Sequence, residues 1–194
     1  MKDITTIAEK GQSLCLQSIR ELCRVFWGPD LQHCREMLGG AFLRPFSAST
    51  EVFNQEAEIS GIQHFFSGFD DEHRLYAFLD ETFIRLFVST RGRIIPPYQS
   101  CYENDGRLMM GPGAVEMKKR LAARGLAVDG QLNEPPDHIS VELEYLYFLL
   151  ETGWIGNDSR SLFEAGDFAN GSNPGQHAFT INVESGCHLF RVVD

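Results

Sequence analysis

The sequence predicts an all-α protein, a helical bundle, and three observations support this prediction. Apolar residues recur at three- and four-residue spacing through most of residues 4–165, which is the period of an amphipathic helix. Glycine and proline gather between these periodic segments, where they end helices. Fifteen phenylalanines and a hydrophobic fraction of 43% supply enough apolar surface for one core. A bundle packed around Phe and Leu side chains is therefore expected.

Four helices are expected in the first half of the chain. Apolar periodicity predicts helices over residues 4–26, 30–38 and 49–66, and Pro45 interrupts the pattern between the second and the third. The clearest helix follows Asp70, which is expected to be its N-cap. Its broad apolar stripe consists of Leu75, Phe78, Leu79, Phe83, Leu86 and Phe87.

The second half begins with a stretch that lacks periodicity. Residues 91–113 are rich in proline and glycine, and an irregular segment of this length inside a compact domain is often functional. Helices are expected again over residues 114–124, 139–153 and 159–169, with glycines ending the first two. Between the first and second of these, residues 128–133 form a polar linker.

Residues 1–169 are predicted to be a single helical domain, and residues 170–194 an atypical tail. Glycines and a proline in the tail disfavour helix, whereas apolar residues alternate over 179–183 as in one strand of a hairpin. An isolated hairpin is marginal in water, so it would have to dock on the bundle or on a second subunit. Three outcomes stay open: a docked tail in a monomer, a dimer formed by segment exchange about a hinge at 128–133, and a tail that tertiary context makes helical.

Charge and composition exclude several classes of function. The chain has 27 acidic and 17 basic residues and a net charge of −10, so nucleic acid is not an expected partner, whereas cationic partners are attracted. No apolar run approaches the roughly 18 residues of a membrane span, and the first residues lack an apolar signal core. Five cysteines without a C-x-x-C pair are typical of reduced structural thiols. A cytoplasmic protein without membrane insertion is expected.

The first candidate site is the segment Glu-Pro-Pro-Asp-His at residues 134–138. His138 and Glu142 stand four residues apart at a helix start and therefore share a face. One interpretation is N-terminal capping by Asp137, and the other is a binding role in addition to capping. The binding candidates are Glu134, Pro136, Asp137, His138 and Glu142. A metal site would need a further ligand at a diagnostic spacing, and none is present, so no metal or other cofactor is expected.

The irregular stretch holds two further candidate groups. Tyr98, Ser100 and Tyr102 could present rings and hydroxyls to a peptide, or the tyrosines could pin the loop to the bundle. Met109 and Met110 are adaptable apolar side chains that suit variable partners or fill the core beneath the loop. No G-x-S-x-G, phosphate-loop or H-E-x-x-H motif occurs, so nucleophilic catalysis has little support from the sequence.

Taken in order along the chain, these motifs resemble those of a known family. The chain is similar to the TorD/DmsD family of cytoplasmic redox enzyme maturation chaperones through Pro-Tyr-x-Ser-x-Tyr at 97–102, Leu-Met-Met-Gly at 108–111 and Glu-Pro-Pro-Asp-His at 134–138. The resemblance covers residues 75–150 in detail and residues 1–74 in helical texture. One departure is Leu121, at a position where the family often has an aromatic residue.

The resemblance implies an all-helical chaperone without enzymatic turnover. Family members bind the twin-arginine signal peptide of a molybdoenzyme catalytic subunit and hold the apoprotein while its cofactor is inserted, before export. The residues that match the family positions are Tyr98, Ser100, Tyr102, Asp137 and His138. An acidic chain with aromatic and methionine surfaces suits a ligand with paired arginines and an apolar segment. The alternative is a helical metal-dependent hydrolase that uses the carboxylates and histidine of residues 134–142.

Overall fold

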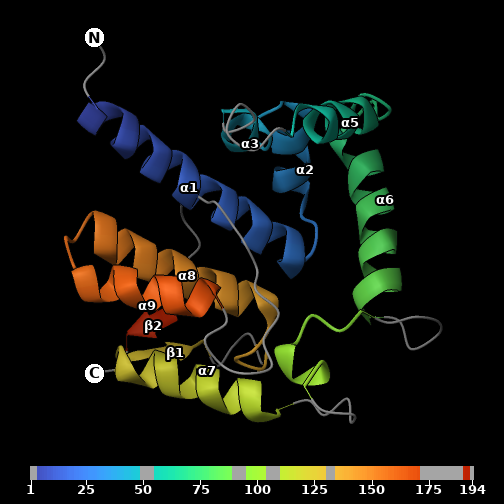
Figure 1. The fold of residues 1–194 in the computed structure, drawn as a ribbon. Helices are drawn as coiled ribbons and strands as arrows, with labels where there is room; N and C mark the ends of the chain where they lie inside the picture. Colours follow the sequence, from blue (N-terminus) through green and yellow to red (C-terminus); the bar gives the residue numbers. More distant parts are fainter. Residues whose placement is uncertain are drawn as a thin grey trace.

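A computed structural model describes residues 4–48, 55–88, 95–103, 110–129, 134–170 and 190–192 (Figure 1). Its helices are α1 (Ile4–Trp27), α2 (Leu31–Leu38), α3 (Arg44–Ala48), α5 (Glu56–Phe66), α6 (Glu72–Phe83), α7 (Pro112–Ala123), α8 (Ile139–Trp154) and α9 (Ser159–Ala169). A π-helical turn, Ile84–Val88, continues α6, and a 3-10 turn, Gln99–Cys101, follows. The predicted all-α helical fold is confirmed.

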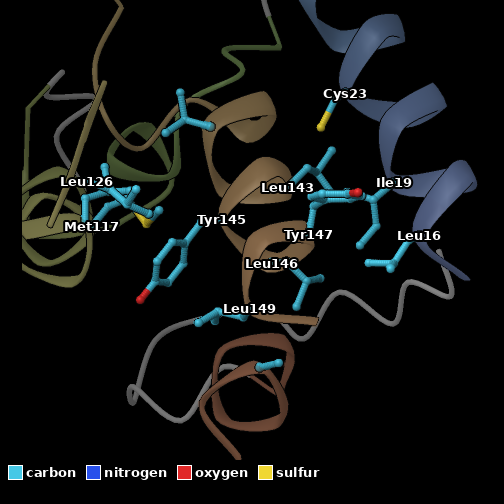
Figure 2. Packing of buried hydrophobic residues seen from close by; sticks show 13 residues of the cluster. Leu16, Ile19, Cys23, Met117, Leu126, Leu143, Tyr145, Leu146, Tyr147 and Leu149 are labelled. Atoms are coloured by element: carbon cyan, nitrogen blue, oxygen red, sulfur yellow. The ribbon is translucent and has the colours of Figure 1, made fainter. Parts of the chain in front are cut away.

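Helix α8 is the centre of the larger core. Its sequence is apolar on nearly every side, which is typical of a buried helix, and Val141, Tyr145 and Leu149 are completely inaccessible to solvent. Helices α1 and α9 both pack against it (Figure 1). Figure 2 shows Ile19 of α1 on one side of α8 and Met117 of α7 on the other. This core therefore holds the N-terminal end of α8, where the candidate site lies.

A second core joins α2, α3, α5 and α6. Its buried members are Cys34, Met37, Leu43, Ile59, Phe66 and Leu75. Polar contacts connect this group to α1, because Arg24 pairs with Glu36 at 2.5 Å and the ring of His33 lies 3.0 Å from Glu21. None of the described helices is long and apolar enough to cross a membrane.

Two expectations about the second group of helices were wrong in detail. The N-cap of α6 is Asp71, whose carboxylate accepts from the N–H groups of His73 and Arg74 at 2.9 and 3.0 Å, while Asp70 pairs with Arg74 on the surface. Asp71 has the extended backbone that an N-cap requires. Pro45 was expected to interrupt helix, but it lies in the first turn of α3, where its missing N–H costs nothing.

The end of the tail forms a strand within the apolar segment 189–193, which the sequence offered as part of a possible hairpin, but its partner was not expected. β1 (Leu126–Val128) pairs antiparallel with β2 (Phe190–Val192), so that Ala127 stands opposite Arg191. The polar linker was expected to begin at residue 128, but this residue is the last one of β1. The alternating segment 179–183 and residues 130–133 of the proposed hinge lie outside the described residues. The tail contacts the helical body through this two-stranded ladder (Figure 1).

Candidate functional site

The structure places the tyrosine loop beside the Glu-Pro-Pro-Asp-His segment. Residues 97–99 and 137–139 run antiparallel, with a bridge between Tyr98 and His138. Backbone hydrogen bonds of 3.0 and 2.8 Å flank this bridge. Two motifs that are separate in the sequence therefore form one site at the start of α8.

Asp137 is the buried centre of this site. It is completely inaccessible, and its Oδ2 accepts a hydrogen bond of 2.8 Å from the backbone N–H of Ser100. Ser100 in turn accepts at its Oγ, over 3.4 Å, from the N–H of Ala114 in α7. The other carboxylate oxygen, Oδ1, has no hydrogen-bond partner among the described residues. Asp137 was expected to cap α8, and this was wrong, because its side chain bonds to the loop instead.

His138 is the residue that caps α8. Its Nδ1 accepts a hydrogen bond of 3.1 Å from the backbone N–H of Ser140. A ring nitrogen that accepts carries no proton, so the neutral ring holds its proton on Nε2. Burial lowers the pKa of His138, although the nearby carboxylates of Glu134 and Asp137 act in the opposite direction. The ring is therefore neutral at physiological pH.

Trp27, the last residue of α1, is a site residue that sequence reasoning missed. Its indole stacks on the ring of His138 with centroids 4.8 Å apart and planes 11° apart. Tyr98 meets the same ring edge to face at 5.3 Å. The Nε1 of Trp27 is buried and has no hydrogen-bond partner in the described part of the chain. A large aromatic at a helix end was the available signal, but it equally fits the core.

The two tyrosines of the loop have different surroundings. The hydroxyl of Tyr98 donates to Glu134 Oε2 at 2.9 Å, and burial together with this carboxylate raises the pKa of Tyr98 above its ordinary value. The hydroxyl of Tyr102 donates to the backbone oxygen of Pro96 at 2.9 Å, while 61% of the residue is exposed. Tyr98 therefore belongs to the interior of the site, and Tyr102 is available to a partner.

Glu103 is a second residue that was not anticipated. Its two carboxylate oxygens accept from the N–H of Gly113 at 2.7 Å and from the side-chain amide of Gln99 at 2.8 Å. A Cβ at Gly113 would stand 2.9 Å from Gln99 Cδ, so glycine leaves the room that this arrangement needs. No sequence signal marked Glu103, because it lies in an aperiodic loop.

Glu142 lies one turn into α8 and is half-buried. Burial is the main cause that raises its pKa to about 8, and the charges of Asp137 and Glu103 add to the effect. Its carboxyl therefore carries a proton at neutral pH. Glu142 and Tyr98 are thus two predicted site residues whose pKa burial raises.

The remaining candidates occupy the edges of the site. Pro136 is half-buried beside Asp137. Met110 is 56% exposed and has a left-handed backbone, with a φ of 63°, that non-glycine residues adopt rarely. Met109 lies outside the described residues. The structure thus brings together Tyr98, Ser100, Glu134, Pro136, Asp137, His138 and Glu142, and leaves Tyr102 and Met110 on the surface.

A pocket of about 840 Å³ lies away from these residues, among α2, α3 and α5. Its apolar lining includes Met37, Leu43 and Phe66 of the second core. Within the described ranges, no three His, Cys, Asp or Glu side chains are grouped so that they could hold a metal ion. The arrangement of residues 134–142 therefore gives no support to the alternative function, that of a metal-dependent hydrolase.

The fold and the site define a helical protein with a buried polar site at the start of its central helix, α8. The sequence profile described as nitrate reductase delta subunit matches residues 56–167, more than half of the chain. The chain therefore belongs to this family, which confirms its resemblance to the TorD/DmsD chaperones.

Three curated relatives, each named Chaperone protein TorD, illustrate the similarity. The protein of Vibrio cholerae (strain O395) is 37% identical over 67 residues, which are 34% of this chain and 30% of the relative. That of Vibrio parahaemolyticus is 41% identical over 64 residues, 33% and 30% of the two chains. That of Escherichia coli (strain E24377A) is 33% identical over 88 residues, 44% and 39%. The matches thus span well under half of each relative's length, and no solved structure matches the chain.

Proposed function

We propose that this protein is a cytoplasmic maturation chaperone for a molybdoenzyme. It binds the twin-arginine signal peptide and the apoprotein of the catalytic subunit, and it assists cofactor insertion and assembly before export, without catalytic turnover. Family membership and relatives named as chaperones support this role. The observation that carries the proposal is the pairing of residues 97–99 with 137–139. This pairing buries the carboxylate of Asp137, whose Oδ1 has no hydrogen-bond partner among the described residues.

The proposed peptide site is bordered by residues 97–111 and 134–142. The acidic side chains of Glu134, Asp137 and Glu142 suit the arginines, because hydrogen bonds between arginine and an ionised carboxylate are charge-assisted and directional. The exposed Tyr102 and Met110 suit an apolar segment of variable sequence. The other members of the proposed site are Tyr98, Ser100, Met109, Pro136 and His138. A net charge of −10 favours the approach of a cationic peptide.

Calorimetry with two synthetic peptides tests this function. One peptide carries two adjacent arginines followed by an apolar segment, and in the other both arginines are alanine. We expect the arginine peptide to bind at least about tenfold more tightly, which is ~1.4 kcal/mol. Equal affinities would contradict recognition by charge. Metal analysis of the purified protein tests the alternative, because a stoichiometric, tightly held metal would favour the hydrolase.

A further inference from the structure

The pocket of about 840 Å³ among α2, α3 and α5 plays no part in the proposed peptide site. Figure 1 shows α3 and α5 at the top of the view, apart from α7 and α8. The lining of the pocket combines buried apolar residues, such as Leu43 and Phe66, with exposed polar residues, such as Arg44 and Gln63. Its volume is typical of ligand sites. The pocket is therefore a candidate for a second binding site.

An exposed aromatic surface continues this pocket from α5 onto α6. The ring centroid of Phe69, which lines the pocket, lies 5.1 Å from that of Phe65 and 5.6 Å from that of Phe78. Phe65 and Phe78 are 40% and 45% exposed, and Ile62, on the same face of α5 as Phe65, is 37% exposed. Large exposed apolar patches mark interaction sites. The pocket and this aromatic surface together suit a polypeptide segment with several apolar side chains better than a small molecule.

The surroundings of the pocket favour a helix as the bound segment. Among the described residues, the elements around it are α2, α3, α5, α6 and the turns that join them, and none of these offers a strand edge. An extended segment would leave its backbone N–H and C=O groups without partners against the apolar lining. A helix pairs these groups internally and can place one apolar face in a groove.

The charges at the pocket favour an occupant with a carboxylate. Arg44 is exposed and has no ion-pair partner in the described part of the chain. The acidic residue of the lining, Asp70, already pairs with Arg74. A cationic segment such as the signal peptide therefore gains little here, whereas a carboxylate gains an ion pair with Arg44. Because exposed ion pairs contribute little free energy, the apolar contacts supply most of the affinity and the charge selects the segment.

We propose that the pocket and the aromatic surface bind an amphipathic helical segment of the client apoprotein, outside its signal peptide, which carries a carboxylate beside its apolar face. This inference rests on the proposed function and adds a second client site, in which the carboxylate pairs with Arg44. An apoprotein that has not completed folding exposes apolar segments that are prone to aggregate. Such a segment is covered in the pocket while the signal peptide occupies its separate site, so both are bound at once.

The first test uses two synthetic helical peptides of about five turns. One has leucines along one face, a single glutamate beside them, and alanine and glutamine elsewhere; the other has lysine in place of the glutamate. At physiological ionic strength, which screens distant charges, the wild-type protein should bind the glutamate peptide about threefold more tightly than the lysine peptide. Saturation with the arginine peptide should leave this binding unchanged.

Two outcomes of this test would overturn the inference. One is displacement of the glutamate peptide by the arginine peptide, which would place both in the same site. The other is failure of the glutamate peptide to bind. If dodecanoate, a small amphiphile with a carboxylate, binds where the peptide does not, the pocket is a small-molecule site and the inference is wrong.

A charge reversal assigns the carboxylate to Arg44. Arg44→Glu should reverse the preference, so that the lysine peptide binds about threefold more tightly than the glutamate peptide. Arg160→Glu makes the same change of charge at an exposed position of α9 and should keep the wild-type preference. If Arg44→Glu still prefers the glutamate peptide, Arg44 does not receive the carboxylate.

A second matched pair tests the aromatic surface. Phe65→Ser removes an exposed ring beside the pocket and should weaken binding of the glutamate peptide about tenfold, since it removes a large apolar contact. Phe163→Ser removes a ring that is 73% exposed on α9 and should bind as wild type. Equal affinities of the two variants would contradict docking on the aromatic surface. Circular dichroism of each variant confirms that it is folded before it is titrated.

The same variants separate failure of the inference from failure of the function. If the arginine peptide binds more tightly than the alanine peptide but the glutamate peptide does not bind, the function stands and the inference is wrong. If the arginine and alanine peptides bind equally, the proposed function is wrong, and the inference falls with it. Arg44→Glu and Phe65→Ser should both bind the arginine peptide as wild type does, because their side chains lie outside its site.

Discussion

The side chain of Asp137 accepts a hydrogen bond of 2.8 Å from the backbone N–H of Ser100, 37 positions away in the sequence. Both residues are buried, with 0% and 1% of their surface exposed. If either group is removed, the other cannot form a replacement hydrogen bond with water. This one bond joins the tyrosine loop to the start of α8 and so creates the candidate site.

Two substitutions at Asp137 should separate its structural from its binding role. Asp137→Ala leaves the N–H of Ser100 buried and unpaired, so we expect the free energy of unfolding to fall by about 2 kcal/mol. Asp137→Asn keeps an oxygen that can accept this bond and should lose less than about 1 kcal/mol. Urea denaturation measures both values. Because the amide lacks the charge, Asp137→Asn should still bind the arginine peptide more weakly, and wild-type binding by a folded Asp137→Asn would exclude the binding role.

His138 should make stability depend on pH. Its pKa in the folded protein lies below the ordinary value of about 6.5, so the unfolded chain binds more protons in acid. The contribution of His138 is complete above about pH 6.5 and is lost as the pH falls below it. His138→Asn supplies an N-cap acceptor that does not titrate, so its unfolding free energy should fall less steeply below about pH 6.5. Denaturation at several pH values measures the slope.

The control for this experiment is the exposed His64 on α5. His64→Asn removes a histidine whose side chain is exposed on the surface of the helix. This variant should retain the wild-type slope of stability against pH. If His64→Asn and His138→Asn reduce the pH dependence of the unfolding free energy equally, burial of His138 is not the cause of this dependence.

A pair of glycine substitutions tests the contact between α8 and α9. Gly153 is buried in α8, and a Cβ there would stand 3.2 Å from the backbone N of Leu162 and closer still to its side chain. Gly153→Ala should push the helices apart and cost about 2 kcal/mol. Gly166→Ala, in α9, meets nothing within 4 Å and should stabilise the helix by about 0.5–1 kcal/mol. Thermal denaturation should show shifts of opposite sign, and shifts of the same sign would argue against the close approach.

Removal of the tail should destabilise the helical body. β2 supplies the pairing partner of β1, whose Leu126 belongs to the larger core. A chain that ends at Ala169 should melt a few degrees lower than the full chain, since ~1 kcal/mol corresponds to about 2–4 °C at this size. A chain that ends at residue 189 should show the same decrease if the loss of β2 is the cause. Light scattering on all three chains shows whether the exposed strand leads to association. An unchanged melting temperature in every chain would mean that the tail covers nothing important.

Local sequence signals predicted three of the helices well, whereas the helix expected over residues 49–66 is described as α5, which begins at Glu56. α1, α2 and α9 begin and end within one residue of the expected positions, because apolar periodicity and helix-ending residues act over a few neighbouring residues. Short elements escaped prediction. The three residues of β1 carry no periodic pattern, and they form a strand because residues 190–192, far along the chain, pair with them. Gly153 was expected to end α8, and the helix ends one residue later, at Trp154, but the sequence did not show that α9 packs against this glycine.

For the site, the sequence by itself determined the family and the residue types. It marked Tyr98, Ser100, Asp137 and His138 through their motifs, but not the roles that the structure shows. Tertiary structure decided that Asp137 bonds to the loop while His138 caps the helix, and it brought Trp27 and Glu103 into the site. The reason is physical: hydrogen bonds between distant segments and loss of solvent arise only when the chain has folded, whereas helix signals are complete within a few residues.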